Sequence, residues 1–423
     1  MVRVGLLGCG TVGGSFCELV AAQRSDIESH SGLTLEITAV AVRNLDADRP
    51  VARELLTLDA RAVATSPDVD VVVETMGGIE PTREIVLSAL AAGKPVVTAN
   101  KELLAHHGAE LYAAADTAGV DLLFEASVAA GIPLIRPLRE SLAGERISRI
   151  MGILNGTTNY ILSQMTEHGA EYSDALAEAQ ELGFAEADPT ADVEGHDAAS
   201  KVAILATLAF GQTVTGSDVF TEGIAALTSE DISNAARLGH VIKLLGIVEM
   251  CDDDRIAARV HPAMVPTTHP LASVRDSFNA VYVEGAGVDQ LMFYGRGAGG
   301  YPTAAMMLGD TIDAGLNVLR STHRPFGVHA TAAIRPMNEL RSAFYVSLDA
   351  RDEPGVLAAI ASVFGEHGVS IQSMEQLGLG DQARLIFITH EAVEGNVRFT
   401  LADLYELDVV KNIGQVIRVV GTT

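Results

Sequence analysis

A glycine motif at residues 8–13, with the sequence GCGTVG, limits what the start of this chain can fold into. It directly follows a short apolar run at residues 2–7 and opens a segment with helical spacing that continues to Val20. A strand, a tight turn and a helix in this order begin a βαβ unit, the context that makes G-x-G-x-x-G typical of dinucleotide binding. Small residues let the backbone approach a pyrophosphate, and the helix N-terminus attracts its negative charge. The residues predicted to bind a dinucleotide here are Gly8, Gly10, Thr11, Val12 and Gly13, and the alternative is a glycine turn that serves packing alone.

Strand-like and helical runs continue to alternate through residues 1–130, which we predict to be an NAD(P)-binding domain. Strand-like runs lie at 35–42, 69–74, 95–98 and 121–125, and alanine-rich helical runs lie at 82–92 and 105–118. This alternation favours an α/β fold with a Rossmann-type, doubly wound parallel sheet.

The pattern changes after residue 130. Residues 131–320 mix a strand-like run at 147–154 with helical runs at 172–182, 197–210 and 303–319, and we predict a second, α+β domain there. Residues 321–342 lack strong periodicity and are interpreted as a connector.

The last segment, residues 343–423, has a βαββαβ order. Its runs are a strand at 344–348, a helix at 354–367, strands at 369–376 and 384–389, a helix at 397–406 and a strand at 415–420. This order is the ferredoxin-like arrangement. Pro354 marks the expected helix start, because a proline at the first helical position loses no needed hydrogen bond.

The composition excludes several kinds of partner. The 55 acidic and 29 basic residues give a net charge of −26, which repels nucleic-acid phosphates and anionic lipid surfaces, so we expect neither as a partner. The three cysteines include no C-x-x-C pair, which favours a reducing compartment. No apolar run reaches the roughly 18 residues of a membrane helix, and the glycine motif follows the N-terminus without a cleavage site. We therefore expect a cytoplasmic protein.

The end of the second expected strand bears on cofactor preference. An acidic residue would be expected there for the ribose 2′-hydroxyl of NAD, but the sequence reads Ala41-Val42-Arg43-Asn44. Arg43 suits a 2′-phosphate better, which favours NADP and leaves NAD possible. The alternative is a solvated arginine at a strand end.

Two lysines are candidates for chemistry. Lys101 follows a buried-looking strand, where ligands of doubly wound sheets bind, although a surface lysine in the first turn of a helix is the alternative. Asp197 and Lys201 are four residues apart, and an almost entirely apolar run at 202–210 follows them. On a helix they share one face, so a partly buried lysine beside a carboxylate is available for proton exchange with an alcohol or carbonyl oxygen. An ordinary helix salt bridge is the alternative reading of this pair.

Six segments together closely resemble homoserine dehydrogenases, in order and over about the first 320 residues. They read GLLGCGTVGG, TANKELLA, EASVAAGIP, LNGTTNYIL, ELGFAEADPTADVEGHDAASK and GRGAGGYPTA. The tail, with DEPGVLAAIASVFGEHGVSIQSMEQ, resembles an ACT domain, a module that commonly binds amino acids. The resemblance implies reversible NAD(P)-dependent oxidation of L-homoserine to L-aspartate 4-semialdehyde, on the route to threonine, methionine and isoleucine.

The resemblance also implies residue roles. Lys201 would be the general acid/base, with Asp197 beside it, and Lys101 would contact both cofactor and substrate. The segment 183–192 would serve the substrate, and Gly299 would contact the cofactor. The implied substrate-binding residues, besides Lys101, are Gly183, Glu186, Asp192, Asn155, Gly156 and Thr157.

The segment EASVAAGI resembles the family's monovalent cation site. Its implied ligands are Glu125 and the backbone carbonyls of Val128, Ala130 and Ile132. Oxygen ligands suit a hard cation such as sodium. From the residues alone this stretch reads as a strand end and a loop.

The resemblance extends to assembly and regulation. It implies a homodimer formed through the second domain, or a homotetramer when the tail takes part. We expect an amino-acid effector such as threonine at the loop 349–355 and the strand near Gln372. Two alternatives are another Rossmann oxidoreductase acting on a small amino-acid-derived carbonyl compound, and a nucleotide-binding regulatory protein without catalysis.

Overall fold

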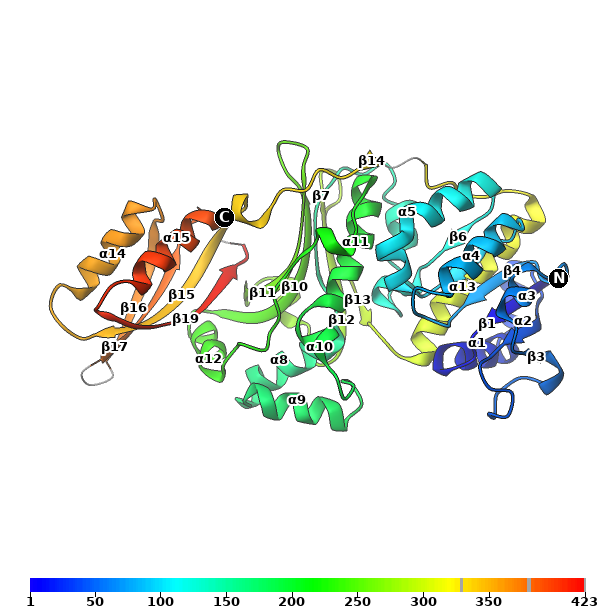
Figure 1. Cartoon of the computed structure of the whole chain (residues 1–423), viewed down its shortest axis with the longest axis horizontal. Helices are drawn as coiled ribbons and strands as arrows, with labels where there is room; N and C mark the ends of the chain where they lie inside the picture. The colour runs from blue at the N-terminus through cyan, green and yellow to red at the C-terminus, as the bar shows by residue number, and fades with distance from the viewer. Residues whose placement is uncertain (328–329, 379–381, 422–423) are drawn as a thin grey trace. The chain divides into compact units, whose positions relative to one another are not determined.

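The computed structural model describes residues 1–327, 330–378 and 382–421 (Figure 1). The chain folds into two compact units, each built from three stretches of sequence. Unit 1 comprises residues 1–150, 200–218 and 279–332, and unit 2 comprises residues 151–199, 219–278 and 333–423. These units do not follow the four segments expected from the sequence, and the boundaries at 130, 320 and 342 stay a prediction.

Unit 1 contains the expected Rossmann-type sheet. Its strand order is β3-β2-β1-β4-β5-β6, and all neighbours are parallel. The strands are β1 (Val2–Leu7), β2 (Leu35–Ala41), β3 (Leu56–Thr57), β4 (Val71–Glu74), β5 (Val96–Thr98) and β6 (Leu122–Leu123). The prediction of a doubly wound α/β domain is confirmed, although the last strand is shorter than the expected run at 121–125.

A helix from much later in the sequence completes this domain. α13 (Gly300–Arg320), yellow in Figure 1, lies among the blue elements and packs against α1 (Thr11–Ala22). Met307 of α13 joins the core that Phe16 of α1 and Leu6 of β1 form. The other helices of unit 1 are α2 (Arg24–Ser31), η1 (Arg53–Leu55), α3 (Ala60–Thr65), α4 (Thr82–Ala91), α5 (Lys101–Ala118), α6 (Ala126–Ala129), α7 (Ile135–Arg139) and η2 (Gly216–Asp218). The remaining strands of this unit are β8 (Gln212–Thr213), β12 (Phe278–Gly285), β13 (Asp289–Arg296) and β14 (Ala330–Thr331).

Unit 2 is organised around a sheet with the strand order β10-β11-β19-β15-β17-β16. β10 (His240–Met250) and β11 (Ile256–Pro266) form a long antiparallel hairpin that sequence patterning did not predict. The other strands are β9 (Phe220–Thr221), β15 (Arg341–Arg351), β16 (Ile371–Gly378), β17 (Gln382–Thr389), β18 (Ala392–Val393) and β19 (Val410–Val419). The helices are α8 (Gly156–His168), α9 (Tyr172–Glu181), α10 (Thr190–Val193), α12 (Ser229–Arg237), η3 (Pro270–Ser273), η4 (Met337–Glu339), α14 (Val356–Glu366) and α15 (Glu394–Tyr405).

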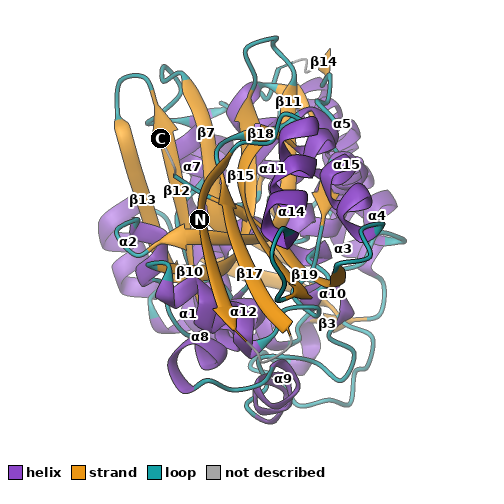
Figure 2. Ribbon diagram, turned by 90° about the vertical axis from the view of Figure 1, so that its left-hand side faces the viewer, coloured by secondary structure: helices purple, strands orange, loops and turns teal. Residues whose placement is uncertain are grey.

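The C-terminal part of unit 2 has the predicted βαββαβ order. α14 and α15 lie on one side of its strands, as Figure 2 shows. Ile360 and Phe364 of α14 pack with Phe344 and Phe387 of the sheet in one buried core. β19 then pairs with β11 in parallel, so the tail sheet continues into the β10–β11 hairpin. Backbone hydrogen bonds therefore join the tail to the β10–β11 hairpin of unit 2.

Several helices begin one to four residues away from the expected position, and two of these differences have a clear local cause. α14 begins at Val356, because Gly355 takes the N-cap position with a left-handed φ of 93° and Pro354 lies before the helix. α5 begins at Lys101, four residues earlier than the apolar pattern indicated, because the Asn100 side chain caps it by accepting from the Leu103 N–H. Three elements, β7 (Ile147–Ile153), α11 (His196–Phe210) and β12, have residues in both units.

Among the residues that the structure describes, no helix combines the length and the apolar character that crossing a bilayer requires.

Candidate functional site

The glycine motif forms a tight backbone junction between β1 and α1. Gly8 has a φ of 94°, and a Cβ atom on it would lie 2.9 Å from the Thr75 backbone. A Cβ atom on Gly13 would lie 2.4 Å from the Gly8 carbonyl oxygen, whereas a Cβ atom on Gly10 would meet nothing within 4 Å. Two glycines are thus needed for packing, and the third leaves the backbone open for a close ligand. This division fits a pyrophosphate at the start of α1, where Thr11 and Val12 form the first turn.

A cavity of about 890 Å³ lies beside this junction. It is bounded by the segments that follow the carboxyl ends of β1, β2 and β4, where ligands of doubly wound sheets bind. Gly8, Gly10 and the exposed Arg43 line it, as do Arg49 and Arg61. The cavity therefore has room for a nucleotide and carries several cationic side chains.

Arg49 is a residue of this cavity that the sequence did not reveal. Its guanidinium donates to the carbonyl oxygen of Cys9 in the glycine motif and, at 3.3 Å, to the carbonyl oxygen of Asn44. Its buried Nε has no hydrogen-bond partner in the described structure. Arg49 thus connects the glycine motif with the segment after β2. No local motif predicts its contact with Cys9, because the two residues are forty positions apart in the sequence.

Glu74 holds the segment of Met76 and Gly77 that lines another wall of the cavity. Its Oε1 accepts the N–H groups of Met76 at 2.6 Å and Gly77 at 3.0 Å, and the Thr98 hydroxyl donates to its Oε2 at 2.5 Å. Complete burial raises the pKa of Glu74. Asn100 extends this network, because its Nδ2 donates to the Gly78 carbonyl at 2.7 Å. The ends of β4 and β5 are therefore fixed together directly before Lys101, the first residue of α5.

Gly299 lies near the glycine motif. It is the N-cap of α13 with a φ of 122°, and a Cβ atom on the next residue, Gly300, would lie 2.7 Å from Ser15 Oγ and 3.1 Å from Thr11 Cγ2. The beginnings of α1 and α13 therefore approach each other closely. This geometry is compatible with the expectation that Gly299 contacts a cofactor.

In unit 2, Asn155 brings together two other predicted site residues. Its Nδ2 donates to Asp192 Oδ1 at 2.6 Å and to Asp197 Oδ2 at 2.9 Å. Its Oδ1 accepts the Thr158 N–H at 2.9 Å and so caps α8, which begins at Gly156. One buried amide thus links α8, α10 and α11 and holds two carboxylates close to each other.

The segment after α9 joins the same cluster. The Thr157 hydroxyl donates to the Phe184 carbonyl at 2.6 Å. Gly183, with a φ of 76°, forms the turn before Phe184. Glu186 lies on this segment with an exposed side chain, and the contact that involves it is a bond from Gln180 Nε2 to its backbone oxygen. The described structure thus gives Gly183 a place beside the cluster and leaves the Glu186 carboxylate solvent-exposed.

Lys201 lies on α11 one turn after Asp197, as the spacing predicted. Its side chain is buried, with 8% of the residue exposed, and Val202 and Ala203 beside it are also buried. Lysine side chains are rarely buried, because burial removes water from the charged ammonium group. The burial of Lys201 one helical turn after Asp197 therefore favours a functional role for this lysine.

The predicted cation segment has an unusual backbone. Ala130 has a φ of 37° and a ψ of −75°, and Gly131 donates to the Arg296 carbonyl at 3.0 Å. Among the described residues, no backbone hydrogen bond from outside the helices reaches the carbonyl oxygens of Val128, Ala130 or Ile132, and all three residues are buried. Buried carbonyls without donors are suitable ligands for a hard cation.

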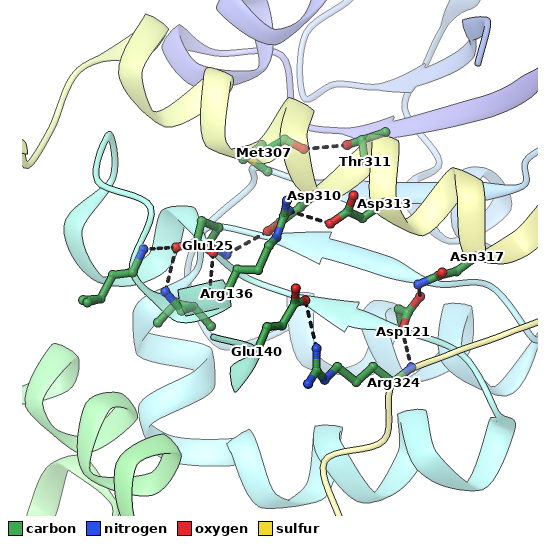
Figure 3. Close-up of polar contacts among 12 residues, drawn as sticks. Asp121, Glu125, Arg136, Glu140, Met307, Asp310, Thr311, Asp313, Asn317 and Arg324 are labelled. Atoms are coloured by element: carbon green, nitrogen blue, oxygen red, sulfur yellow. Dashed lines mark hydrogen bonds and ion pairs between the residues drawn. The ribbon is translucent and has the colours of Figure 1, made fainter. Parts of the chain in front are cut away.

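The Glu125 side chain has a different immediate role. Its carboxylate accepts the N–H groups of Leu134, of Ile135 at 2.6 Å and of Arg136 at 2.7 Å, which caps α7 (Figure 3). Its own N–H donates to Asp310 at 2.8 Å, and burial raises the pKa of Asp310 to about 7. Three of roughly four lone-pair directions of the carboxylate are then used, which leaves one for a cation.

No group of three or more His, Cys, Asp or Glu side chains suited to a metal ion occurs in the described ranges. A cation at this segment would therefore depend mainly on backbone oxygens.

Comparison with known proteins assigns both units to one family. The chain matches the models for the homoserine dehydrogenase NAD binding domain at residues 8–125, homoserine dehydrogenase at residues 133–312 and the ACT domain at residues 344–402. It is 49% identical to the homoserine dehydrogenase of Corynebacterium glutamicum, over 99% of this chain and 95% of that protein. It is 47% identical to the homoserine dehydrogenase of Mycobacterium tuberculosis, over 100% of this chain and 98% of that protein.

Solved structures give the same result. A homoserine dehydrogenase from Thiobacillus denitrificans has a TM-score of 0.94 and 42% identity, with 99% of this chain and 98% of that chain covered. A hyperthermophilic archaeal homoserine dehydrogenase in complex with NADPH has a TM-score of 0.64 and 27% identity, with 75% of this chain and 98% of that chain covered.

The glycine packing generates a prediction. We expect Gly13→Ala to weaken NADPH binding about tenfold or more, because its Cβ atom would force the Gly8 carbonyl away from its position. Gly14→Ala is the matched control, since its Cβ atom would meet nothing nearer than Pro50 at 3.8 Å. Titration of NADPH fluorescence measures both affinities. Equal affinities in the two variants would contradict the binding of a pyrophosphate at the glycine motif.

Proposed function

This chain belongs to the homoserine dehydrogenase family of NAD(P)-dependent oxidoreductases that act on a CH–OH group, and we propose how its residues serve the oxidation of L-homoserine to L-aspartate 4-semialdehyde. The observation that carries the proposal is the link from Asn155 to Asp192 and Asp197. It gathers two carboxylates on the helices α10 and α11, and α11 also carries Lys201. Carboxylates bind the ammonium group of the substrate, and a lysine can exchange the proton of its hydroxyl.

In the proposed reaction the substrate alcohol loses a hydride from carbon and a proton from oxygen. The nicotinamide cofactor supplies the hydride acceptor when bound. Lys201 Nζ accepts the hydroxyl proton during oxidation and returns it during reduction. Asp192 and Glu186 hold the substrate, the Gly183 backbone borders it, Asp197 orients Lys201, and Lys101 contacts cofactor and substrate. Asn155, Gly156 and Thr157 fix the start of α8 beside Asp192.

Substitution of Lys201 tests the proposal. We expect Lys201→Ala to reduce kcat by about 10²- to 10⁴-fold, the usual contribution of general acid–base catalysis, with little change in NADPH affinity. Lys201→Arg keeps the positive charge but cannot release a proton near neutral pH, so it should be equally inactive. The rate of aspartate semialdehyde reduction is followed at about 340 nm. Recovery of activity in Lys201→Arg would show that charge alone is needed.

We further propose that NADP is the preferred cofactor, with NAD possible. Arg43 supports this, because it lines the cavity directly after β2 where an acidic residue would select NAD.

Substitution of Arg43 tests this preference. We expect Arg43→Ala to lower kcat/KM for NADPH about tenfold while changing that for NADH little. Arg61→Ala is a matched control, since Arg61 lines the same cavity but is already bound to Glu84 at 3.0 Å. Equal losses with both cofactors would contradict a contact between Arg43 and the 2′-phosphate.

Sodium is the proposed cation at the segment 125–132, supported by the carbonyls of Val128, Ala130 and Ile132, which accept no backbone hydrogen bond from outside the helices in the described ranges. We expect sodium chloride to raise the thermal midpoint by several degrees relative to tetramethylammonium chloride of equal ionic strength, because a ligand stabilises the state that binds it. Scanning calorimetry without substrate measures this difference. Identical midpoints would remove the cation from the proposal.

We propose an amino-acid effector, threonine, at the ACT loop 349–355. Gln376 Nε2 donates to Asp352 at 3.1 Å, and Arg384 Nε donates to Asp349 at 2.7 Å, so the loop is held at its first residue and at its middle. L-threonine should bind in a calorimetric titration and lower the rate, with L-methionine as the comparison. Failure of threonine to bind would leave a different effector for this loop. The homodimer or homotetramer implied by the resemblance stays a prediction, which the mass in solution tests.

A further inference from the structure

Arg418 connects the tail to the body of unit 2. It lies on β19 with 6% of its surface exposed, and its guanidinium forms a two-point ion pair with buried Glu394, at 3.0 Å through Nε and 2.6 Å through Nη2. Its Nη1 donates to Glu222 Oε2 at 2.8 Å. A buried guanidinium requires such carboxylate partners to offset its desolvation. Glu394 belongs to the tail, but Glu222 belongs to a segment almost two hundred residues earlier.

Glu222 stands in a short segment, residues 220–224, that lies between β11 and α10. The Glu222 N–H donates to the Val260 carbonyl of β11 at 2.8 Å, and the Ile224 N–H donates to the Val193 carbonyl of α10 at 2.9 Å. A Cβ atom on Gly223 would lie 2.4 Å from the Val193 oxygen. The segment thus contacts α10 backbone against backbone, which leaves little room for independent movement.

α10 carries Asp192, the carboxylate that accepts from Asn155 at 2.6 Å. The path from Arg418 to Asp192 therefore has three steps: an ion pair to Glu222, the chain of residues 222–224, and the contact with Val193. A second contact from the same strand strengthens it, because Gln415 Nε2 donates to the Ala226 carbonyl at 2.8 Å.

We propose that Arg418 is a positioning residue for the substrate. Through its ion pair with Glu222, Arg418 of β19 keeps the segment 220–224 in contact with α10. This contact determines the position of Asp192 on α10. The inference rests on the proposed role of Asp192 in substrate binding. Arg418 acts through Asp192, so its loss should raise the KM for homoserine rather than lower kcat.

The test breaks the ion pair at its less buried end. Glu222→Gln removes one charge from a side chain that is 39% exposed and leaves the Arg418–Glu394 pair intact. We expect the KM for L-homoserine to rise about three- to tenfold, with kcat and NADPH affinity changed less than about twofold, which is the size of coupling that such contacts carry. Arg418→Lys keeps the positive charge but makes fewer hydrogen bonds to Glu222 and Glu394. We therefore expect the KM for L-homoserine to rise in this variant too, but less than in Glu222→Gln, because the attraction between the charges remains.

Glu375→Gln is the matched control. It breaks a different ion pair between the tail sheet and α12, formed by Arg237 and a Glu375 side chain of 43% exposure, and it does not involve residues 220–224. Its KM should equal that of the wild type. An unchanged KM in Glu222→Gln, or an equal rise in both variants, overturns the inference. If the wild-type enzyme does not oxidise L-homoserine at all, the proposed function fails instead.

Discussion

The arrangement of the candidate substrate site depends on one amide. Asn155 has two N–H donors on one nitrogen, and it uses them for two carboxylates that would otherwise repel each other, Asp192 and Asp197. The same side chain caps α8 through its oxygen. Three helices of different length and sequence origin are therefore fixed by one residue, and a small displacement of any of them changes the separation of the carboxylates.

Local sequence signals were sufficient where a feature is made by neighbouring residues. The glycine motif predicted the β1–α1 junction because the requirement for Gly13 is a contact with Gly8, five residues earlier in the chain. The spacing of Asp197 and Lys201 likewise predicted their common helix. The roles of Asn155 and the carbonyls of 128–132 came instead from resemblance, since nothing local in LNGTTN or EASVAAGI indicates a partner.

Features made by residues far apart in the sequence were missed, because such contacts leave no signal in a local stretch of sequence. β10 and β11 have buried polar residues, among them Lys243 and His261, which interrupt the alternation that marks a strand. Lys243 is tolerated there because its Nζ donates to Asn159 at 2.9 Å and to the Val274 carbonyl at 2.5 Å, while burial lowers its pKa to about 8. Arg49 and Glu74 likewise bind partners that are far away in the sequence, Cys9 and Thr98. Their partners become visible only when the sheet brings them together.

The pairing of β19 with β11 changes how the tail must be regarded. A regulatory domain joined by a flexible connector could be removed without consequence for the rest of the chain. Here the removal of β19 would expose part of the edge of β11 and leave Glu222 without its guanidinium partner. The tail strands and the β10–β11 hairpin are parts of one continuous sheet. A displacement of β19 has a physical route to Asp192 through Glu222 and Val193, because closely packed backbones pass small displacements on to their neighbours.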